Sequence, residues 1–213
     1  MMRQRDQGDD LREAQERLRR FLKGDTAERL FRHPISHPAR PTGFCACDRS
    51  LAGMLRIWLR GALLQTVLVL PFNQPKLRAL RMLGARIGQH VHIAVGAWVD
   101  PTYPQLLTIE DDVFIGMGAR IFMHEFRRDE FRAGKCIIRR GAFIGAYALI
   151  GPGIEIGENA TVAACTPLDR DVPAGCTALG NPPRIVRRAE TPAGKRAPEE
   201  VAAEAAHADG ETC

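Results

Sequence analysis

Aromatic residues are scarce in this chain of 213 residues, which holds only 2 Trp and 2 Tyr and an aromatic share of 6%. Few stacking side chains and a net charge of only +5, dispersed along the sequence, argue against a nucleic-acid partner. Gly and Pro are plentiful at 20 and 14, so turns are frequent, and this composition favours an all-β solenoid over a helical bundle. The mild basic excess fits an anionic small ligand or a membrane surface.

A paired cysteine framework is also absent, although the chain holds six cysteines. The first residues, MMRQRDQGDD, lack the apolar stretch of a signal peptide, so we expect a cytoplasmic protein with reduced thiols. One segment, HPISHPARPTGFCAC, gathers potential metal ligands, which are His33, His37, Cys45 and Cys47. The C-x-C spacing and the prolines favour an irregular linker, and we expect no metal site.

No apolar run is long and uninterrupted enough to suggest a membrane span, which needs roughly 20 residues. A helix is expected over residues 9–32, then a Pro-rich linker, then a helix that starts near Ser50. Arg56 and Arg60 interrupt the apolar run of this second helix. Residues 1–84 therefore form a helical region with a linker. The favoured interpretation packs helix 51–70 on the main domain or on a neighbouring subunit. The alternative is peripheral membrane association through residues 51–81, with arginines and a lysine toward lipid phosphates: Arg56, Arg60, Lys76, Arg78 and Arg81.

The middle third contains a six-residue repeat, which is the strongest signal in the sequence. An aliphatic residue recurs every six positions, interrupted once after Asp100 and once after His124. Its positions are Ile87, Ile93, Val99, Ile109, Ile115, Ile121, Ile138, Ile144, Ile150, Ile156, Val162 and Leu168. This period fits a coil with three flat faces, in which the aliphatic side chains point into a narrow core and a following glycine permits the bend. Four coils are expected between residue 87 and about residue 173.

The repeat resembles the hexapeptide-repeat acyltransferases, whose fold is a left-handed parallel β-helix. A second match is VAACTPLDRDVPAGCTALGNPPRIVRR, which resembles the closing segment of that family. The resemblance covers roughly residues 76–188 and is closest to the sugar and antibiotic O-acetyltransferase branch. It implies a mainly β protein with a β-helix domain over 85–188, a loop extruded over 124–137, and a disordered tail over 189–213.

Transfer of an acyl group from a thioester to a hydroxyl needs a base that works near neutral pH, and imidazole suits this task. His124 stands where the repeat stops and the loop leaves, and the family also carries its catalytic histidine there, so His124 is the expected base. The resemblance gives Asp100 a substrate-binding role at a position where asparagine is common, although a turn-initiating Asp before Pro101 is an alternative. Glu125 is a candidate for orienting the histidine or binding substrate, and a solvated loop carboxylate without such a role is an equal alternative. Met123 replaces the usual Thr or Ser before the histidine.

The resemblance also implies acetyl-CoA as the acyl donor, bound along a groove beside the coils. The positions expected to bind it are Gly145, Ala146, Ala164, Asp169, Arg170, Arg184 and Arg187. The arginines suit the phosphates of the donor. Ala146 and Asp169 depart from the family pattern, which has a serine-like residue and a threonine at these positions.

The resemblance implies a homotrimer with active sites between neighbouring solenoids, acting on a small-molecule acceptor. We expect an acyl-CoA-dependent O-acyltransferase that uses a sugar or related hydroxyl. Two alternatives stay open: a non-catalytic hexapeptide-repeat protein, and a zinc enzyme like the γ-class carbonic anhydrases, for which His90, His92 and His124 are the available histidines.

Overall fold

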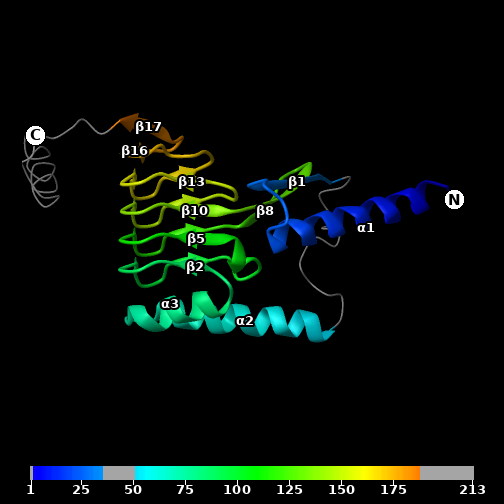
Figure 1. Ribbon diagram of the computed structural model, residues 1–213, viewed down its shortest axis with the longest axis horizontal. Coiled ribbons are helices and arrows are strands. Elements are labelled where there is room, and N and C mark those ends of the chain that lie inside the picture. Colours follow the sequence, from blue (N-terminus) through cyan, green and yellow to red (C-terminus); the bar gives the residue numbers. More distant parts are fainter. Residues whose placement is uncertain (1, 36–50, 188–213) are drawn as a thin grey trace, which may run out of the picture.

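The computed structural model describes residues 2–35 and 51–187, with backbone only for residues 2–12, 51–54 and 56. A triangular β-solenoid forms the body, α2 (Leu51–Val69) and α3 (Asn73–Met82) cross one end of it, and α1 (Met2–Lys23) lies to one side (Figure 1). The predicted tail over 189–213 lies outside the described residues, as does most of the predicted linker.

Each wall of the solenoid is a parallel sheet of very short strands stacked one coil above another. The first wall contains β2 (Arg86–Ile87), β5 (Leu107–Ile109), β10 (Cys136–Ile138) and β13 (Glu155–Ile156). The second contains β3 (His92–Ile93), β6 (Phe114–Ile115), β11 (Phe143–Ile144), β14 (Thr161–Val162), β16 (Cys176–Leu179) and the antiparallel closing strand β17 (Arg184–Arg187). The third contains β4 (Trp98–Val99), β7 (Arg120–Ile121), β12 (Leu149–Ile150) and β15 (Pro167–Leu168).

The predicted aliphatic positions form one ladder inside each wall, which confirms the repeat. In the second wall, for example, Ile93 pairs with Ile115, Ile115 with Ile144, and Ile144 with Val162. Eleven of the twelve positions are buried, and the remaining one, Ile87 in the first coil, is half-buried. One ladder residue and a second buried residue two positions earlier, such as Ala119 or Ala148, fill the narrow interior at each face. A six-residue period is therefore sufficient to specify the core.

The glycines that follow the ladder residues have a different role from the predicted one. A Cβ on Gly116 would lie 2.6 Å from the backbone nitrogen of Ala146, and one on Gly145 would lie 2.5 Å from that of Ala164. These glycines are required because the next coil passes too close for a side chain. The bend itself depends on a positive φ two residues later, as at Gly118 and Tyr147.

The segment that leaves the solenoid is a β-hairpin rather than an irregular loop. It contains β8 (His124–Phe126) and β9 (Glu130–Gly134), and β1 (Leu30–Pro34) pairs antiparallel with β9 to complete a three-stranded arm. The predicted loop end at residue 137 is two residues too late, because Cys136 already belongs to the wall.

The predicted helix over 9–32 is also too long: α1 ends at Lys23, and Gly24 follows with a φ of +85°. Phe31 and His33 then alternate inward as strand residues.

Helices α2 and α3 cap the first coil, which has no coil beneath it. In every other coil the strand carbonyls accept N–H groups from the coil before, as Ile115 O does from Ala94. In the first coil, side chains of the two helices replace those donors: Asn73 bonds Val91 O at 2.7 Å, Lys76 bonds Ile93 O at 2.8 Å and Arg81 bonds Gly88 O at 2.7 Å. The helix pair therefore packs on the main domain, as the favoured interpretation had it, and Lys76 and Arg81 face the solenoid rather than lipid. Within the described residues, no helix has the length and apolar character needed to cross a bilayer.

Candidate functional site

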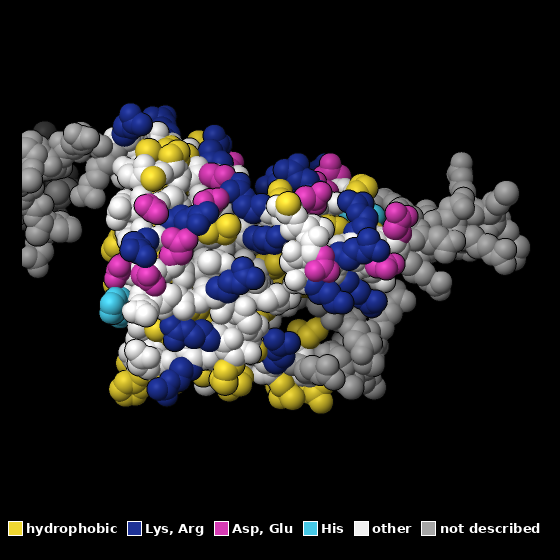
Figure 2. All heavy atoms as spheres, viewed as in Figure 1, with side chains coloured by type: hydrophobic (Ala, Val, Ile, Leu, Met, Phe, Trp, Pro, Cys, Tyr) yellow, Lys and Arg dark blue, Asp and Glu magenta, His cyan; other side chains and the backbone are white. Residues whose placement is uncertain are grey.

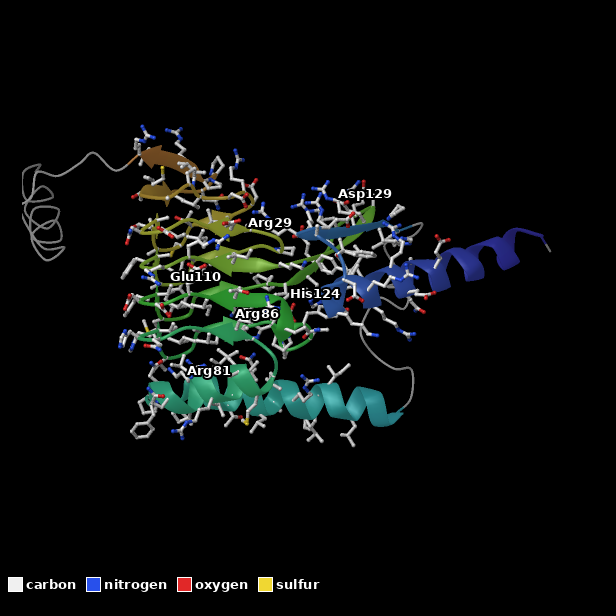
Figure 3. All side chains as sticks on the ribbon, viewed as in Figure 1. Arg29, Arg81, Arg86, Glu110, His124 and Asp129 are labelled. Atoms are coloured by element: carbon white, nitrogen blue, oxygen red, sulfur yellow. The ribbon has the colours of Figure 1, made fainter. Side chains whose placement is uncertain are left out.

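His124 and Asp100 meet at the solenoid corner where the arm begins (Figure 3 labels His124). Asp100 directly follows β4 and His124 begins β8, and the paired strands β4 and β7 bring the two residues to the same corner in adjacent coils. The carboxylate is fully buried, and its Oδ2 forms a short hydrogen bond with His124 Nδ1. The backbone N–H of Met123 donates to Oδ2 at 3.2 Å, and that of Thr102 donates to Oδ1 at 2.9 Å.

This arrangement determines which imidazole nitrogen is free. Both carboxylate oxygens already act as acceptors for backbone donors, so the contact with His124 places the proton on Nδ1. The opposite nitrogen, Nε2, then carries a lone pair. The imidazole side chain is 21% exposed, so part of the ring can meet a ligand at the corner. A histidine held by a buried carboxylate is an arrangement suited to a general base.

Aromatic side chains surround the imidazole. The ring of the buried Tyr103 lies edge-on to His124 at 5.3 Å between centroids, and Phe126 and Phe131 each lie at 6.1 Å. Tyr103 comes from the insertion after Asp100, and Phe131 comes from the arm. Sequence reasoning missed both residues, although the insertion itself was visible as a break in the six-residue phase.

The position of Asp100 does not fit direct contact with an acceptor, because its carboxylate has no exposed surface and its oxygens are occupied. Its partner is the histidine. The signal was present in the sequence: Val99 and Ile121 are equivalent positions in successive coils, so residues that closely follow each of them share one corner.

Glu125 lies on the other side of the arm, in a pocket of about 370 Å³ between the arm and the upper coils. Its carboxylate bonds Arg127 at 2.7 Å and lies 3.6 Å from Arg132. Asp169 and Arg170 line the same pocket and form an ion pair at 2.8 Å, and this hydrogen bond from Arg170 lowers the pKa of Asp169. Figure 2 shows basic side chains on both sides of this recess. The structure thus brings together three residues that the sequence placed in two different roles.

The other predicted donor-binding residues lie elsewhere on the chain. Gly145, Ala146 and Ala164 stack in successive coils at the corner between the second and third walls, at the far edge of the third wall from His124. Arg184 and Arg187 are exposed on β17 at the closed end of the solenoid. Within one chain these groups do not converge on the imidazole.

The histidines proposed for a zinc enzyme do not converge either. His90 lies at the corner between the first and second walls and bonds Asp112 at 3.2 Å, and His92 stacks on Phe114. In the part of the chain that the structure describes, no three His, Cys, Asp or Glu side chains are placed to hold a metal ion. Of the four potential ligands near the linker, only His33 is described, and it is buried in β1.

Comparison with known proteins identifies the family. Residues 135–166 match the family model described as bacterial transferase hexapeptide (six repeats). The chain is 35% identical over 104 residues to a Bacillus subtilis (strain 168) protein that bears the name acetyltransferase YvoF, covering 49% of this chain and 60% of that protein. It is 41% identical over 110 residues to a Staphylococcus aureus (strain MSSA476) protein also named an acetyltransferase, covering 51% of this chain and 68% of that protein. The match thus spans less than two thirds of the first relative and slightly more than two thirds of the second.

A solved structure shares the fold. It is the hexapeptide-repeat containing acetyltransferase of Vibrio cholerae O1 biovar eltor, complexed with acetyl coenzyme A. The TM-score is 0.53 at 22% identity, over 66% of this chain and 91% of that chain.

The chain belongs to the hexapeptide-repeat acetyltransferase family. Membership implies that the three parallel walls wind as a left-handed β-helix.

Proposed function

We propose that the protein transfers an acetyl group from acetyl-CoA to a hydroxyl of a sugar or a related small molecule. The observation that carries the proposal is the pairing of His124 with the buried Asp100 at the corner where the arm leaves the solenoid. Family membership and the acetyl-CoA bound to the Vibrio cholerae structure support the choice of donor.

In this mechanism His124 Nε2 accepts the proton of the acceptor hydroxyl while the hydroxyl oxygen attacks the thioester carbon. The new C–O bond forms, the C–S bond of the donor breaks, and the imidazolium returns the proton to the departing sulfur. Asp100 acts as a positioning residue, because it holds Nδ1–H and orients the ring without touching the acceptor. The aromatic side chains around the ring leave only 21% of the imidazole side chain exposed.

The donor-binding residues are assigned by resemblance, and they form three groups that would contact different parts of the ligands. Gly145, Ala146 and Ala164 lie in adjoining coils at one corner, where the backbones of the two coils pass close together and none of the three residues carries more than a methyl group. Arg184 and Arg187 are exposed cations suited to the phosphates of CoA. Arg170 and Asp169 lie in the pocket with Glu125, where we place polar contacts to the acceptor or donor.

We further propose that the active form is a homotrimer. Large apolar side chains are exposed on the second wall, on the third wall and at the corner between them, which is the corner of the donor-binding residues: Phe114, Met117, Phe143, Tyr147 and Leu149. Burial of this surface against a neighbouring solenoid would bring the donor-binding corner of one subunit toward the His124 corner of another. This accounts for the separation of the two groups within one chain.

The replacement His124→Ala tests the function. We expect release of free CoA from acetyl-CoA, in the presence of a panel of sugar, nucleotide-sugar and amine acceptors, to fall by about 10³-fold. Acetyl-CoA affinity and trimer mass should be unchanged. Undiminished transfer by this variant excludes His124 as the base, whereas wild-type protein that binds acetyl-CoA but acetylates none of the panel requires a different acceptor class.

The same assay separates the alternatives. A non-catalytic solenoid neither binds nor consumes acetyl-CoA. A zinc enzyme copurifies with metal and loses activity on chelation. The buried carboxylate behind His124 favours the acetyltransferase, because it holds the imidazole as a general base requires, in addition to accepting from two backbone N–H groups.

A further inference from the structure

Four polar side chains of the helix pair α2–α3 point toward the protein rather than away from it. Gln65, Asn73, Lys76 and Arg81 all bond backbone carbonyls of the first coil. The buried apolar side chains of the pair, such as Leu64 and Leu68, fill the end of the core. The inner surface of the pair is therefore fully used.

The outer surface of the pair remains apolar and exposed. On α2 it presents Leu55, Trp58, Leu59 and Leu63, at the spacing of one helical face and opposite the face that carries Leu64 and Leu68. Phe72 continues the surface at the start of α3, and Met82 lies at the end of α3. Trp58 and Phe72 are each 67% exposed. Figure 2 shows hydrophobic side chains along this lower edge of the molecule, with basic side chains among them.

Charge determines what kind of partner suits this surface. Residues 49–99 contain seven Lys or Arg and no Asp or Glu. Of these, Arg60 and Arg78 are exposed on α2 and α3. Two copies of such a surface placed face to face would repel each other, since neither supplies an acidic partner. An anionic lipid surface instead accepts the apolar side chains below its headgroups and pairs its phosphates with the arginines.

We propose that the outer face of α2–α3, defined by Leu55, Trp58, Leu59, Leu63, Phe72 and Met82, binds the surface of an anionic membrane. The helices lie in the plane of the headgroups and the solenoid stands on them, so the His124 corner stays on the water side. Tryptophan at such a boundary places its apolar ring in the acyl region and its N–H among the headgroups. The inference does not depend on the proposed catalysis.

The test uses the full chain and vesicles of phosphatidylcholine with roughly 30% phosphatidylglycerol, against vesicles of phosphatidylcholine alone. We expect cosedimentation with the anionic vesicles only, weakened by added salt. Trp58→Ser combined with Leu59→Ser should reduce the partition constant by about tenfold or more. The matched control is Val186→Ser, which removes an exposed apolar side chain at the opposite end of the solenoid and should not change binding. His124→Ala should bind vesicles as the wild type does.

Tryptophan fluorescence gives a second measurement, which reports on Trp58 itself. The chain has only two tryptophans, so Trp98→Phe leaves Trp58 as the sole indole. Its emission should shift to shorter wavelength when anionic vesicles are added. The proposal is overturned if the wild type ignores anionic vesicles, or if the double variant binds as well as the wild type. It is also overturned if the wild type self-associates in solution, the double variant does not, and added vesicles do not compete with this self-association.

Discussion

The solenoid walls and the arm corner are built in opposite ways. Each wall repeats one contact, an aliphatic side chain on the equivalent residue of the next coil, and backbone hydrogen bonds join every coil to its neighbour. The corner contains contacts that occur once. They join residues far apart in sequence, as in the Asp100–His124 pair and the packing of Phe31 against Phe131 at 6.4 Å.

The difference explains where function resides in this fold. A wall residue is constrained by the coils on both sides, so it has little freedom to take part in chemistry. Where the chain leaves the wall, that constraint ends and polar side chains can be placed without disturbing the ladder. The site is therefore attached to a scaffold that does not need it for stability. A substitution at the corner should therefore leave the stability of the walls unchanged, and a substitution in a wall should leave catalysis unchanged.

Asp100→Asn should disable the corner and leave the walls intact. Asparagine replaces one of the two carboxylate oxygens by an NH2 donor, which must face either Thr102 N–H or the Met123 and His124 donors. The negative charge that holds His124 Nδ1–H is also lost, so the imidazole is held less firmly. We expect kcat to fall by about 10²-fold with little change in KM for acetyl-CoA. The measurement is steady-state CoA release, with urea denaturation to show that the solenoid remains folded.

The structure offers a matched control for this variant. Asp112 also bonds a histidine, His90, but this pair is exposed at another corner. Asp112→Asn should leave the rate unchanged. If Asp100 acts through the histidine, adding Asp100→Asn to His124→Ala should lower the rate no further. A further loss in the double variant would show a role for Asp100 that is independent of His124.

Ile156→Ala should do the reverse, weakening a wall while sparing the corner. Ile156 is fully buried in the ladder of the first wall and pairs with Ile138. Its truncation should lower the free energy of unfolding by about 2–5 kcal/mol. Glu158→Ala, at an exposed residue two positions away, should change it by less than about 0.5 kcal/mol. Urea denaturation at one fixed protein concentration measures both. A folded Ile156→Ala protein with much lower kcat would contradict the independence of the two regions.

The same difference explains what could be predicted from the sequence. The wall residues could be predicted one by one, because a contact that recurs in every coil requires an aliphatic residue at a fixed spacing in the sequence. Ile93, Ile115 and Ile144, for example, occupy the equivalent position in successive coils. The point where the chain leaves the solenoid could also be predicted, because the six-residue repeat stops at His124. The pairing of β1 with β9 was not, because Phe31 and Ala133 are joined across a hundred residues by a contact that occurs only once. The role of Asp100 was missed for a related reason: its partner lies one coil away, while sequence reasoning looked for a ligand.

Cys136 lies at the junction of the two regions, and its thiol makes the stability of the fold depend on pH. It is the first residue of β10, where the chain returns from the arm to the wall. Its Sγ lies 3.3 Å from the carbonyl oxygens of both Phe122 and Gly151. Burial raises the pKa of this thiol from its ordinary value of 9.0 to about 12. The folded protein therefore keeps the proton through a pH range in which the unfolded chain releases it.

The sign of the effect follows from this difference in bound protons. Below pH 9 the thiol is protonated in both states, so its contribution to stability is fully present, and it is lost progressively as pH rises from 9 toward 12. At pH 10.5 the loss should be about 2 kcal/mol. We expect the free energy of unfolding of the wild type, relative to Cys136→Ala, to fall by this amount between pH 8 and pH 10.5 in urea titrations. Taking the difference between the two proteins at each pH removes the contribution of every other titrating group. A difference that stays constant over this range would mean that the junction opens to solvent, and that the arm is held to the wall less tightly than the contacts of Cys136 imply.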